Sequence, residues 1–356
     1  MEAGAAGCRG PGLALCGALM AASGGSRFLA SRYQEPSVDD LFMYDCITAG
    51  KNSQEDRGQD GQPAVKTSDD ILAFAFSSSG GYFALTDDNK RLILFRTKPC
   101  WECLSVRSVV RRCTSLIITA AEDKILVADK SGDVYSYSIT EPQKAGKIEL
   151  GHLSLLLDVD CTLRLWEYKS GKEVHCCHLN SLNKTEAIKN DKKYAVSRIA
   201  YCCQGNYIAI LCDCIPTVYI FQFDAATQLL NYRHQISLKH KGWDIAFEET
   251  GGLWILQEDK EASLLLYRPV DEHWQPVADD KGLMKMSKYL HDNWTMFEGS
   301  VETESCYSSL YKASFDNMAI YLQKKEERLQ QQQKKRKELQ HESNKQTKKI
   351  RTRESY

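Results

Sequence analysis

Short apolar runs separated by polar turns follow one another along the chain as far as about residue 270. Three such runs make up a unit that recurs, and the clearest copy, residues 73–96, contains AFAFSSSG, GYFALTDD and KRLILFR. Similar units cover residues 113–139, 197–224 and 242–269. The first two runs of each unit are mostly apolar, which is typical of strands covered on both faces of their sheet. The pattern therefore predicts a chain built from β-strands.

An aromatic residue near the end of the third run serves as a register mark for each unit. The marks are Tyr44, Phe95, Tyr137, Trp166, Phe221 and Tyr267. A period of roughly 40–45 residues with four strands per unit is typical of WD-repeat β-propellers. The two longest intervals contain polar segments, residues 49–66 and 181–193, which we interpret as loop insertions. We predict an all-β propeller over residues 1–300.

One unit is incomplete, near residues 151–170. Gly-His, a dipeptide typical of WD repeats, stands at 151–152, and residues 153–159 read as the first strand of the unit. Only a two-residue turn separates this strand from the third, residues 162–168, so the second strand is missing. The unpaired backbone groups would cost about 1–3 kcal/mol each.

We favour loss of about one repeat plus one strand, roughly 60 residues, by splicing or gene-model error. The alternative is an irregular blade whose partner strand comes from elsewhere. Six units remain recognisable, one of them defective.

The net charge of −1 conceals an uneven distribution, because residues 324–356 carry twelve Lys or Arg against five Asp or Glu. Residues 308–333 are predicted to form an amphipathic helix. Its apolar stripe consists of Tyr311, Phe315, Met318, Leu322 and Leu329. Residues 334–356 are predicted to be a basic, disordered tail, in which residues 334–337 (KKRK) fit either a nuclear import signal or a solvated charge run.

The sequence contains none of the common catalytic motifs. There is no G-x-G-x-x-G after a strand, no G-K-[ST], no G-x-S-x-G and no H-E-x-x-H. A methyltransferase or nucleotide-binding enzyme that acts alone would need a glycine-rich turn for its cofactor. We therefore expect no catalytic residues and no cofactor bound by this chain. No apolar run approaches the ~20 residues of a membrane helix, so no membrane association is expected.

Fourteen cysteines are present, most of them inside strand-like segments. We expect buried thiols in a reducing compartment, because disulfide frameworks belong to short, loop-rich secreted chains. Residues 13–22 resemble the core of a signal peptide, but the segment before them has little positive charge. Cys100 and Cys103 have the spacing of zinc ligands, yet a structural zinc site needs four. The nearest candidates, residues 175–178, would point to alternate faces of a strand, so we expect no metal.

Several long phrases in the chain resemble one known family. They are GGSRFLA (24–30), FALTDDNKRLILFRTKP (83–99), LVADKSGDVYSYS (126–138), ELGHLSLLLDV (149–159) and YKASFDNMAIYLQKKEERLQQQ (311–332). The family is the WD-repeat, non-catalytic subunit of the vertebrate tRNA guanine-N(7) methyltransferase. The resemblance covers nearly the whole chain and implies a seven-bladed propeller. It also implies a heterodimer with a Rossmann-like catalytic subunit that binds S-adenosylmethionine.

The resemblance further implies that the pair methylates guanine in the variable loop of some tRNAs. The family's partner-binding motif Ala-Asp-Lys-Ser-Gly-Asp is present, and its lysine is Lys130. From the residues alone, Lys130 fits an ordinary turn, in which Gly132 takes a positive φ and Asp129 and Asp133 are turn-formers. A second contact turn of the family, Asp-Arg-Asp-Glu-Lys-Ile-Arg, is absent after residue 159.

The main hypothesis is a non-catalytic scaffold subunit of a tRNA methyltransferase heterodimer. In it, Lys130 binds the catalytic subunit, while Lys324, Lys325 and Arg328 face tRNA phosphates beside it. The helix that carries these cations fits docking on the propeller's own surface equally well. One alternative, also attributed to the resembled family, is a substrate adaptor for a ubiquitin ligase scaffold, and another is an inactive splice form. We expect the protein in the nucleus, or in both nucleus and cytoplasm.

Overall fold

The computed structural model describes residues 10–49, 68–129, 133–150, 162–167, 172–179, 196–213, 215–271, 273–303 and 325. The predicted insertions at 49–66 and 181–193 lie outside the described residues, apart from Ala49. The predicted helix at 308–333, apart from Lys325, and the tail at 334–356 lie outside them too. The chain divides into two compact units, Met1–Tyr311 and Lys312–Tyr356. None of the helices among the described residues is long and apolar enough to cross a membrane.

Six antiparallel sheets, here called A to F in chain order, make up the first unit within the described residues. Sheet A contains β1 (Gly12–Cys16), β2 (Leu19–Gly24), β3 (Arg27–Arg32) and β4 (Phe42–Asp45). Sheet B contains β5 (Ile71–Phe76), β6 (Tyr82–Asp87), β7 (Arg91–Arg96) and β8 (Glu102–Ser108). Sheet C contains β9 (Cys113–Ile118), β10 (Lys124–Asp129), β11 (Val134–Ser138) and β12 (Lys147–Leu150).

Sheet D has two described strands, β13 (Thr162–Glu167) and β14 (Lys172–His178). Sheet E contains β15 (Val196–Cys202), β16 (Tyr207–Cys212), β17 (Ile215–Asp224) and β18 (Leu229–Ser237). Sheet F contains β19 (Gly242–Phe247), β20 (Leu253–Gln257), β21 (Leu264–Val270) and β22 (His273–Pro276). The helical elements are α1 (Cys46–Ala49), α2 (Lys281–Asp292), η2 (Trp294–Met296) and η3 (Glu298–Ser300).

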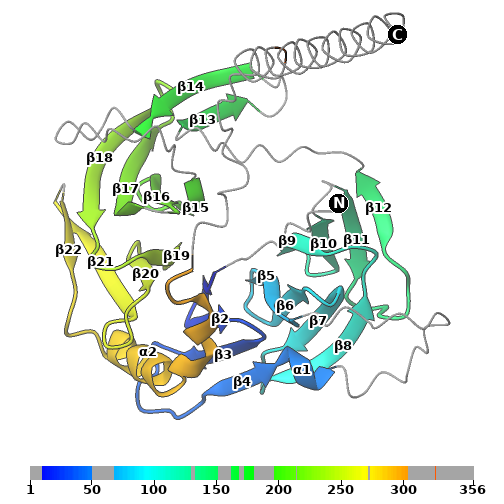
Figure 1. Cartoon of the computed structure of the whole chain (residues 1–356). Coiled ribbons are helices and arrows are strands. Elements are labelled where there is room, and N and C mark those ends of the chain that lie inside the picture. The colour runs from blue at the N-terminus through cyan, green and yellow to red at the C-terminus, as the bar shows by residue number, and fades with distance from the viewer. Residues whose placement is uncertain are drawn as a thin grey trace, which may run out of the picture. The chain divides into compact units, whose positions relative to one another are not determined.

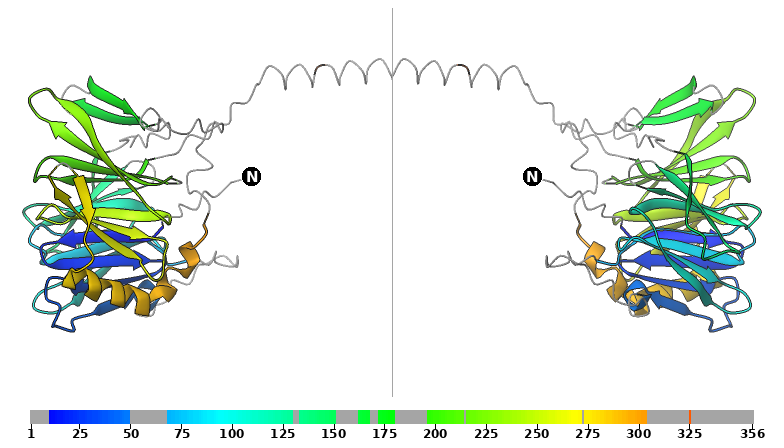
Figure 2. Two further views of the ribbon diagram at one scale, coloured as in Figure 1. Left: turned by 90° about the vertical axis from the view of Figure 1, so that its left-hand side faces the viewer. Right: turned by 90° about the vertical axis from the view of Figure 1, so that its right-hand side faces the viewer.

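The strands of each four-stranded sheet pair in chain order, as in the blades of a propeller. The first strand of these sheets lies toward the middle of the arrangement and the fourth strand lies outside (Figure 1). Seen from the side, the strands lie along broadly the same axis, so the turns between them gather at two opposite ends (Figure 2). The predicted all-β propeller fold is confirmed, with six recognisable units, five of them four-stranded within the described residues.

Apolar clusters between neighbouring sheets hold the blades together. They join D to E, E to F, F to A, A to B and B to C. The central strands are buried on both faces because a blade lies on each side: Phe83, Leu85 and Ile93 of sheet B pack toward sheet A, while Ala84 and Leu92 pack toward sheet C. This two-sided burial explains why the sequence of these strands is continuously apolar rather than alternating.

The register mark in the first blade was misplaced. Tyr44 lies in β4, the fourth strand of sheet A, and not in the third. The third strand, β3, reads RFLASR and has no aromatic residue near its end, because its only ring, Phe28, lies near the start. Phe95, Tyr137, Phe221 and Tyr267 do lie in third strands, as predicted. The aromatic mark therefore fails in the first blade, where the ring of β3 lies near its start.

Large apolar side chains are exposed on both sides of sheet D, which has two described strands. Among the described residues, no apolar cluster joins sheet C to sheet D. On β9, Leu116 packs toward sheet B, and successive residues of a strand point to opposite faces. Ile117 therefore points away from sheet B, and it is 57% exposed. On β15, Ile199 and Tyr201 pair with residues facing sheet D and are 60% and 56% exposed. These residues stand where further strands of a complete propeller would cover them.

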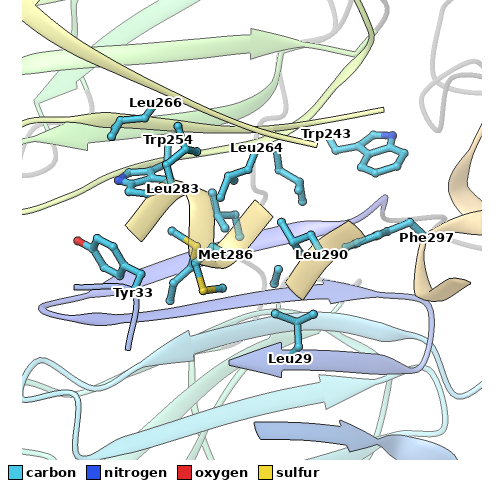
Figure 3. Packing of buried hydrophobic residues seen from close by; sticks show 14 of the residues in the cluster. Leu29, Tyr33, Trp243, Trp254, Leu264, Leu266, Leu283, Met286, Leu290 and Phe297 are labelled. Carbon is cyan, nitrogen blue, oxygen red and sulfur yellow. The ribbon is translucent and has the colours of Figure 1, made fainter. Parts of the chain in front are cut away.

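Helix α2 fills the junction between sheets F and A (Figure 3). Its start is capped by Asp280, whose carboxylate accepts a hydrogen bond of 2.9 Å from the backbone N–H of Leu283. Leu283, Met286 and Leu290 are spaced along one face and pack against both sheets. This helix was not predicted from the sequence, although its Asp cap and the spacing of these apolar residues are visible there.

Lys285 fastens α2 to the loop between β3 and β4. Its ammonium donates hydrogen bonds to the backbone carbonyls of Arg32 and Glu35, both 2.9 Å, and to the carboxylate of Asp40 at 2.8 Å. The Lys285 side chain is only 6% exposed. Burial opposes ionisation of Asp40, but hydrogen bonds from Lys285, Ser31 and the Arg32 amide hold its pKa below the usual value. The hydrogen bonds of Lys285 therefore join the loop and the helix in one polar network.

We expect Lys285→Met to lower the free energy of unfolding by about 1–3 kcal/mol at pH 7, because two carbonyls and a carboxylate each lose one of their donors. The pKa of Asp40 is lower in the folded than in the unfolded chain. The ion pair therefore stabilises the fold above pH 4 and stops doing so as the pH falls through the folded pKa. Chemical denaturation measures the free energy of unfolding of variant and parent at pH 7 and below pH 4. The difference between the two chains should be smaller at the lower pH. Lys288→Met, on the exposed side of α2, is the matched control and should change little.

Candidate functional site

The turn between β10 and β11 carries the predicted partner-binding residue. Lys130 itself lies outside the described residues, but the residues that bound its turn are described. The backbone N–H of Asp129 donates to the carbonyl of Asp133 at 2.9 Å, and the N–H of Asp133 donates to the Asp129 carboxylate at 3.1 Å. Asp129 and Asp133 are thus turn-formers, as predicted. These two hydrogen bonds join Asp129 to Asp133 across the ends of β10 and β11.

Arg111, from the loop between β8 and β9, reaches the same turn. Its Nη1 lies 3.3 Å from Oδ2 of Asp133 and 3.7 Å from Oδ2 of Asp129. The Asp129 carboxylate is fully buried, whereas the Arg111 side chain is 49% exposed. The guanidinium offsets the negative charge of the two carboxylates, so the residues that bound this turn form a compensated cluster rather than an acidic one.

The turn between β6 and β7 joins this assembly from the other side. The backbone N–H of Val109 donates to the carbonyl of Lys90 at 2.8 Å. Nε of Arg112 donates to the carbonyl of Asp88 at 3.1 Å, and its Nη2 lies 3.5 Å from the Asp88 carboxylate. Three segments from sheets B and C are therefore fastened side by side.

We call residues 87–90 and 109–112, together with Asp129 and Asp133, the three-turn surface. It presents the side chains of Lys90, Val110 and Arg111 to solvent. Its described carboxylates are each engaged: Asp87 with Arg91, Asp88 with Arg112, and Asp129 and Asp133 with Arg111. The exposed groups of this surface are thus mainly cationic, with one apolar side chain among them. Such a surface suits a protein partner that carries acidic and apolar groups.

Sequence analysis singled out Lys130 and missed the other residues of this surface. The signal available was the pair Arg111-Arg112 beside an apolar Val109-Val110, in a connection between two strands. That signal is weak, because the sequence does not show which turns lie next to one another. Packing of sheet B against sheet C brings the three turns together.

The predicted nucleic-acid residues are described only in part. Lys325 is helical and exposed, and it belongs to the unit Lys312–Tyr356. Lys324 and Arg328 lie outside the described residues. An exposed helical lysine is free to contact phosphate, and its role stays a prediction.

Cysteine and histidine side chains in the described parts of the chain form no group of three or more ligands able to hold a metal. Cys100 and Cys103 are exposed on the outer side of sheet B. His175 accepts a hydrogen bond of 3.1 Å from the backbone N–H of Leu230, so its Nδ1 is engaged in joining β14 to β18. Burial raises the pKa of the neighbouring Cys177 thiol, which makes it a poor nucleophile and ligand.

Comparison with known proteins gives consistent matches. Residues 31–154 match the family model described as the tRNA methyltransferase TRM82 WD40 domain. The chain is 50% identical to the human protein named tRNA (guanine-N(7)-)-methyltransferase non-catalytic subunit WDR4, covering 88% of this chain and 90% of that protein. The Xenopus laevis and Danio rerio proteins of that name are 40% and 38% identical, over 87% and 81% of this chain and 92% and 85% of theirs. Among solved structures, that of the RRP9 WD40 repeats covers 71% of this chain and 73% of its own at 13% identity, with a TM-score of 0.44.

The alignment with the human relative has more positions than this chain has residues aligned in it. It spans 371 residues, whereas 88% of the 356 residues of this chain is about 313, which leaves about 58 without a counterpart. The Xenopus laevis alignment, 370 residues against 87% of this chain, shows a similar excess. This number is close to the roughly 60 residues whose loss the sequence predicts. Sheet D has two strands among the described residues.

Proposed function

Because this chain belongs to the family of tRNA (guanine-N(7)-)-methyltransferase non-catalytic subunits, we propose that it is the non-catalytic scaffold of such an enzyme. The observation that carries the proposal is the 50% identity to the human subunit over 88% of this chain. The absence of a glycine-rich cofactor turn in the sequence supports it. The chain contributes a preformed surface to a catalytic subunit and performs no reaction of its own.

In this proposal the catalytic subunit binds S-adenosylmethionine and docks on the three-turn surface, with Lys130 as one contact. The hydrogen bonds between Asp129 and Asp133 and the Arg111 ion pairs support this, because side chains and backbone that are already held in place lose little conformational entropy on binding. Lys324, Lys325 and Arg328 add contacts to tRNA phosphates. Residues 334–337 direct the complex to the nucleus. The product is N(7)-methylguanine in the variable loop of tRNA.

The test is co-expression of this chain with the catalytic methyltransferase subunit, followed by affinity measurement and a tRNA methylation assay. We expect Lys130→Glu to weaken the complex at least about tenfold, because it places a negative charge against an acidic or aromatic partner group. Lys124→Glu is the matched control, since Lys124 is an exposed lysine at the opposite end of the same strand β10. It should leave the affinity unchanged.

Two results would contradict the proposal. One is equal binding of the parent and the Lys130→Glu chain, which would remove the turn from the interface. The other is methylation of tRNA by this chain alone, which would make it an enzyme rather than a scaffold.

A further inference from the structure

We propose that Val110 and Lys90 form a second contact with the catalytic subunit, beyond Lys130. An apolar socket on that subunit covers Val110, and an Asp or Glu side chain beside the socket pairs with Lys90. This inference rests on the proposed function, because it assumes a complex with the catalytic subunit. It names the part of the three-turn surface that gives that complex its affinity.

Val110 stands at the tip of a loop that is anchored on both sides. Before it, Val109 is buried in the cluster between sheets B and C, and its N–H is bonded to the Lys90 carbonyl. After it, Arg112 is bonded to Asp88 and Cys113 is buried in the same cluster. The hydroxyl of Thr86 also donates to the Cys113 carbonyl at 2.9 Å. A partner that covers Val110 therefore meets a side chain whose backbone is already ordered.

The exposure of Val110 is the highest of any large apolar side chain among the described residues, at 67%. A single exposed valine is ordinary on a protein surface. Here, however, the side chain stands beside Arg111 on a loop whose hydrogen bonds hold its backbone in place. At an interface centre the surrounding contacts exclude water from the buried side chain, and contacts of the partner around Val110 would do so here.

Lys90 supplies the charge of this contact. It forms no ion pair with any residue in the part of the chain that the structure describes, whereas Arg91, Arg111 and Arg112 each face a carboxylate. Its backbone takes a positive φ of 59°, which closes the turn between β6 and β7. The side chain is exposed and available to an acidic group on a partner.

The surface favours a protein over tRNA. The Arg111 guanidinium lies 3.3 and 3.7 Å from the Asp133 and Asp129 carboxylates, so this cation is already paired within the chain. Val110 offers nothing to a phosphate group, and an aliphatic valine offers no aromatic plane for a base to stack on. An acidic and apolar protein segment matches both groups at once.

The experiment measures binding of the full chain to the catalytic subunit by surface plasmon resonance, with Val110→Asp, Val110→Ile and Lys90→Glu. Val110→Asp should weaken binding about tenfold or more, mainly through faster dissociation, whereas Val110→Ile should bind normally. Lys90→Glu should slow association and reduce its dependence on salt. Val270→Asp, at an exposed valine on sheet F, and Lys124→Glu are the matched controls. Thermal unfolding should show that all variants remain folded, because the changed side chains are exposed.

The outcomes separate this inference from the proposed function. If Lys130→Glu weakens binding while Val110→Asp and Lys90→Glu do not, the second contact does not exist and the scaffold role stands. If Lys90→Glu leaves assembly intact but lowers the affinity of the heterodimer for tRNA, the surface binds RNA and the inference is overturned. If the parent chain does not bind the catalytic subunit at all, both proposals fail together.

Discussion

Returning the missing stretch to the junction between Val159 and Asp160 is expected to raise the free energy of unfolding by on the order of 5 kcal/mol. The inserted residues would be those of the human relative that have no counterpart in this chain, about 58 in number. They would cover Ile117, Ile199 and Tyr201, and each large apolar side chain taken out of water contributes about 1.5–3 kcal/mol. Chemical denaturation of the parent and the restored chain measures the difference. Binding of a hydrophobic dye should fall in parallel, since the exposed faces disappear.

A flexible Gly/Ser insert of equal length at the same junction is the control, because it lengthens the chain without adding strands. It should leave stability unchanged or lower it. Equal stability of the parent and the restored chain would show that the exposed faces are already covered by other means. Comparing the two chains in the methylation assay then addresses the alternative of an inactive splice form. If only the restored chain supports methylation, the short chain serves no catalytic partner.

Changing Lys324, Lys325 and Arg328 together to Glu is expected to weaken tRNA binding by the heterodimer on the order of 100-fold, because three charge-assisted phosphate contacts are replaced by repulsion. The slope of the logarithm of the tRNA affinity against the logarithm of salt concentration should also become less steep, by about 2 to 3. Assembly of the heterodimer should be unchanged. Fluorescence anisotropy with labelled tRNA over a series of salt concentrations measures both quantities.

The matched control for this change is the triple variant Lys345→Glu, Lys348→Glu and Lys349→Glu, which alters the same charge further along the tail. A specific role for the helix predicts a smaller effect there. An equal loss for both variants would mean that the tail acts only through its net charge. Unchanged tRNA affinity in the first variant would remove these three cations from the nucleic-acid surface.

The strands and their repetition could be predicted because each blade strand is apolar on both faces and ends in a polar turn. This signal is local, so residues 73–96 alone predicted β5, β6 and β7. The incomplete blade was visible for the same reason, as a break in a period. Tyr44 was placed one strand too early because the marking aromatic is absent from β3, where the core of sheet A takes Phe28 near the start of the strand instead.

Helix α2 was missed for a different reason. Its signal, Asp280 followed by apolar residues at 283, 286 and 290, spans only 12 residues within a chain dominated by strands. Its position is decided by contacts with two sheets that lie at opposite ends of the propeller sequence. The buried Lys285 illustrates this, because three of its partners come from residues 32–40, far away in the chain.

By itself, the sequence determined the strands and the propeller class, because both depend on residues close together in the chain. Only the tertiary structure decided which turns lie together. Lys90, Val110 and Arg111 become one surface because sheets B and C pack face to face and place the ends of their strands side by side. The exposure of Ile117 and Ile199 likewise depends on which sheets stand beside them. Contacts between blades depend on packing across the whole fold, so a local pattern of residues does not encode them.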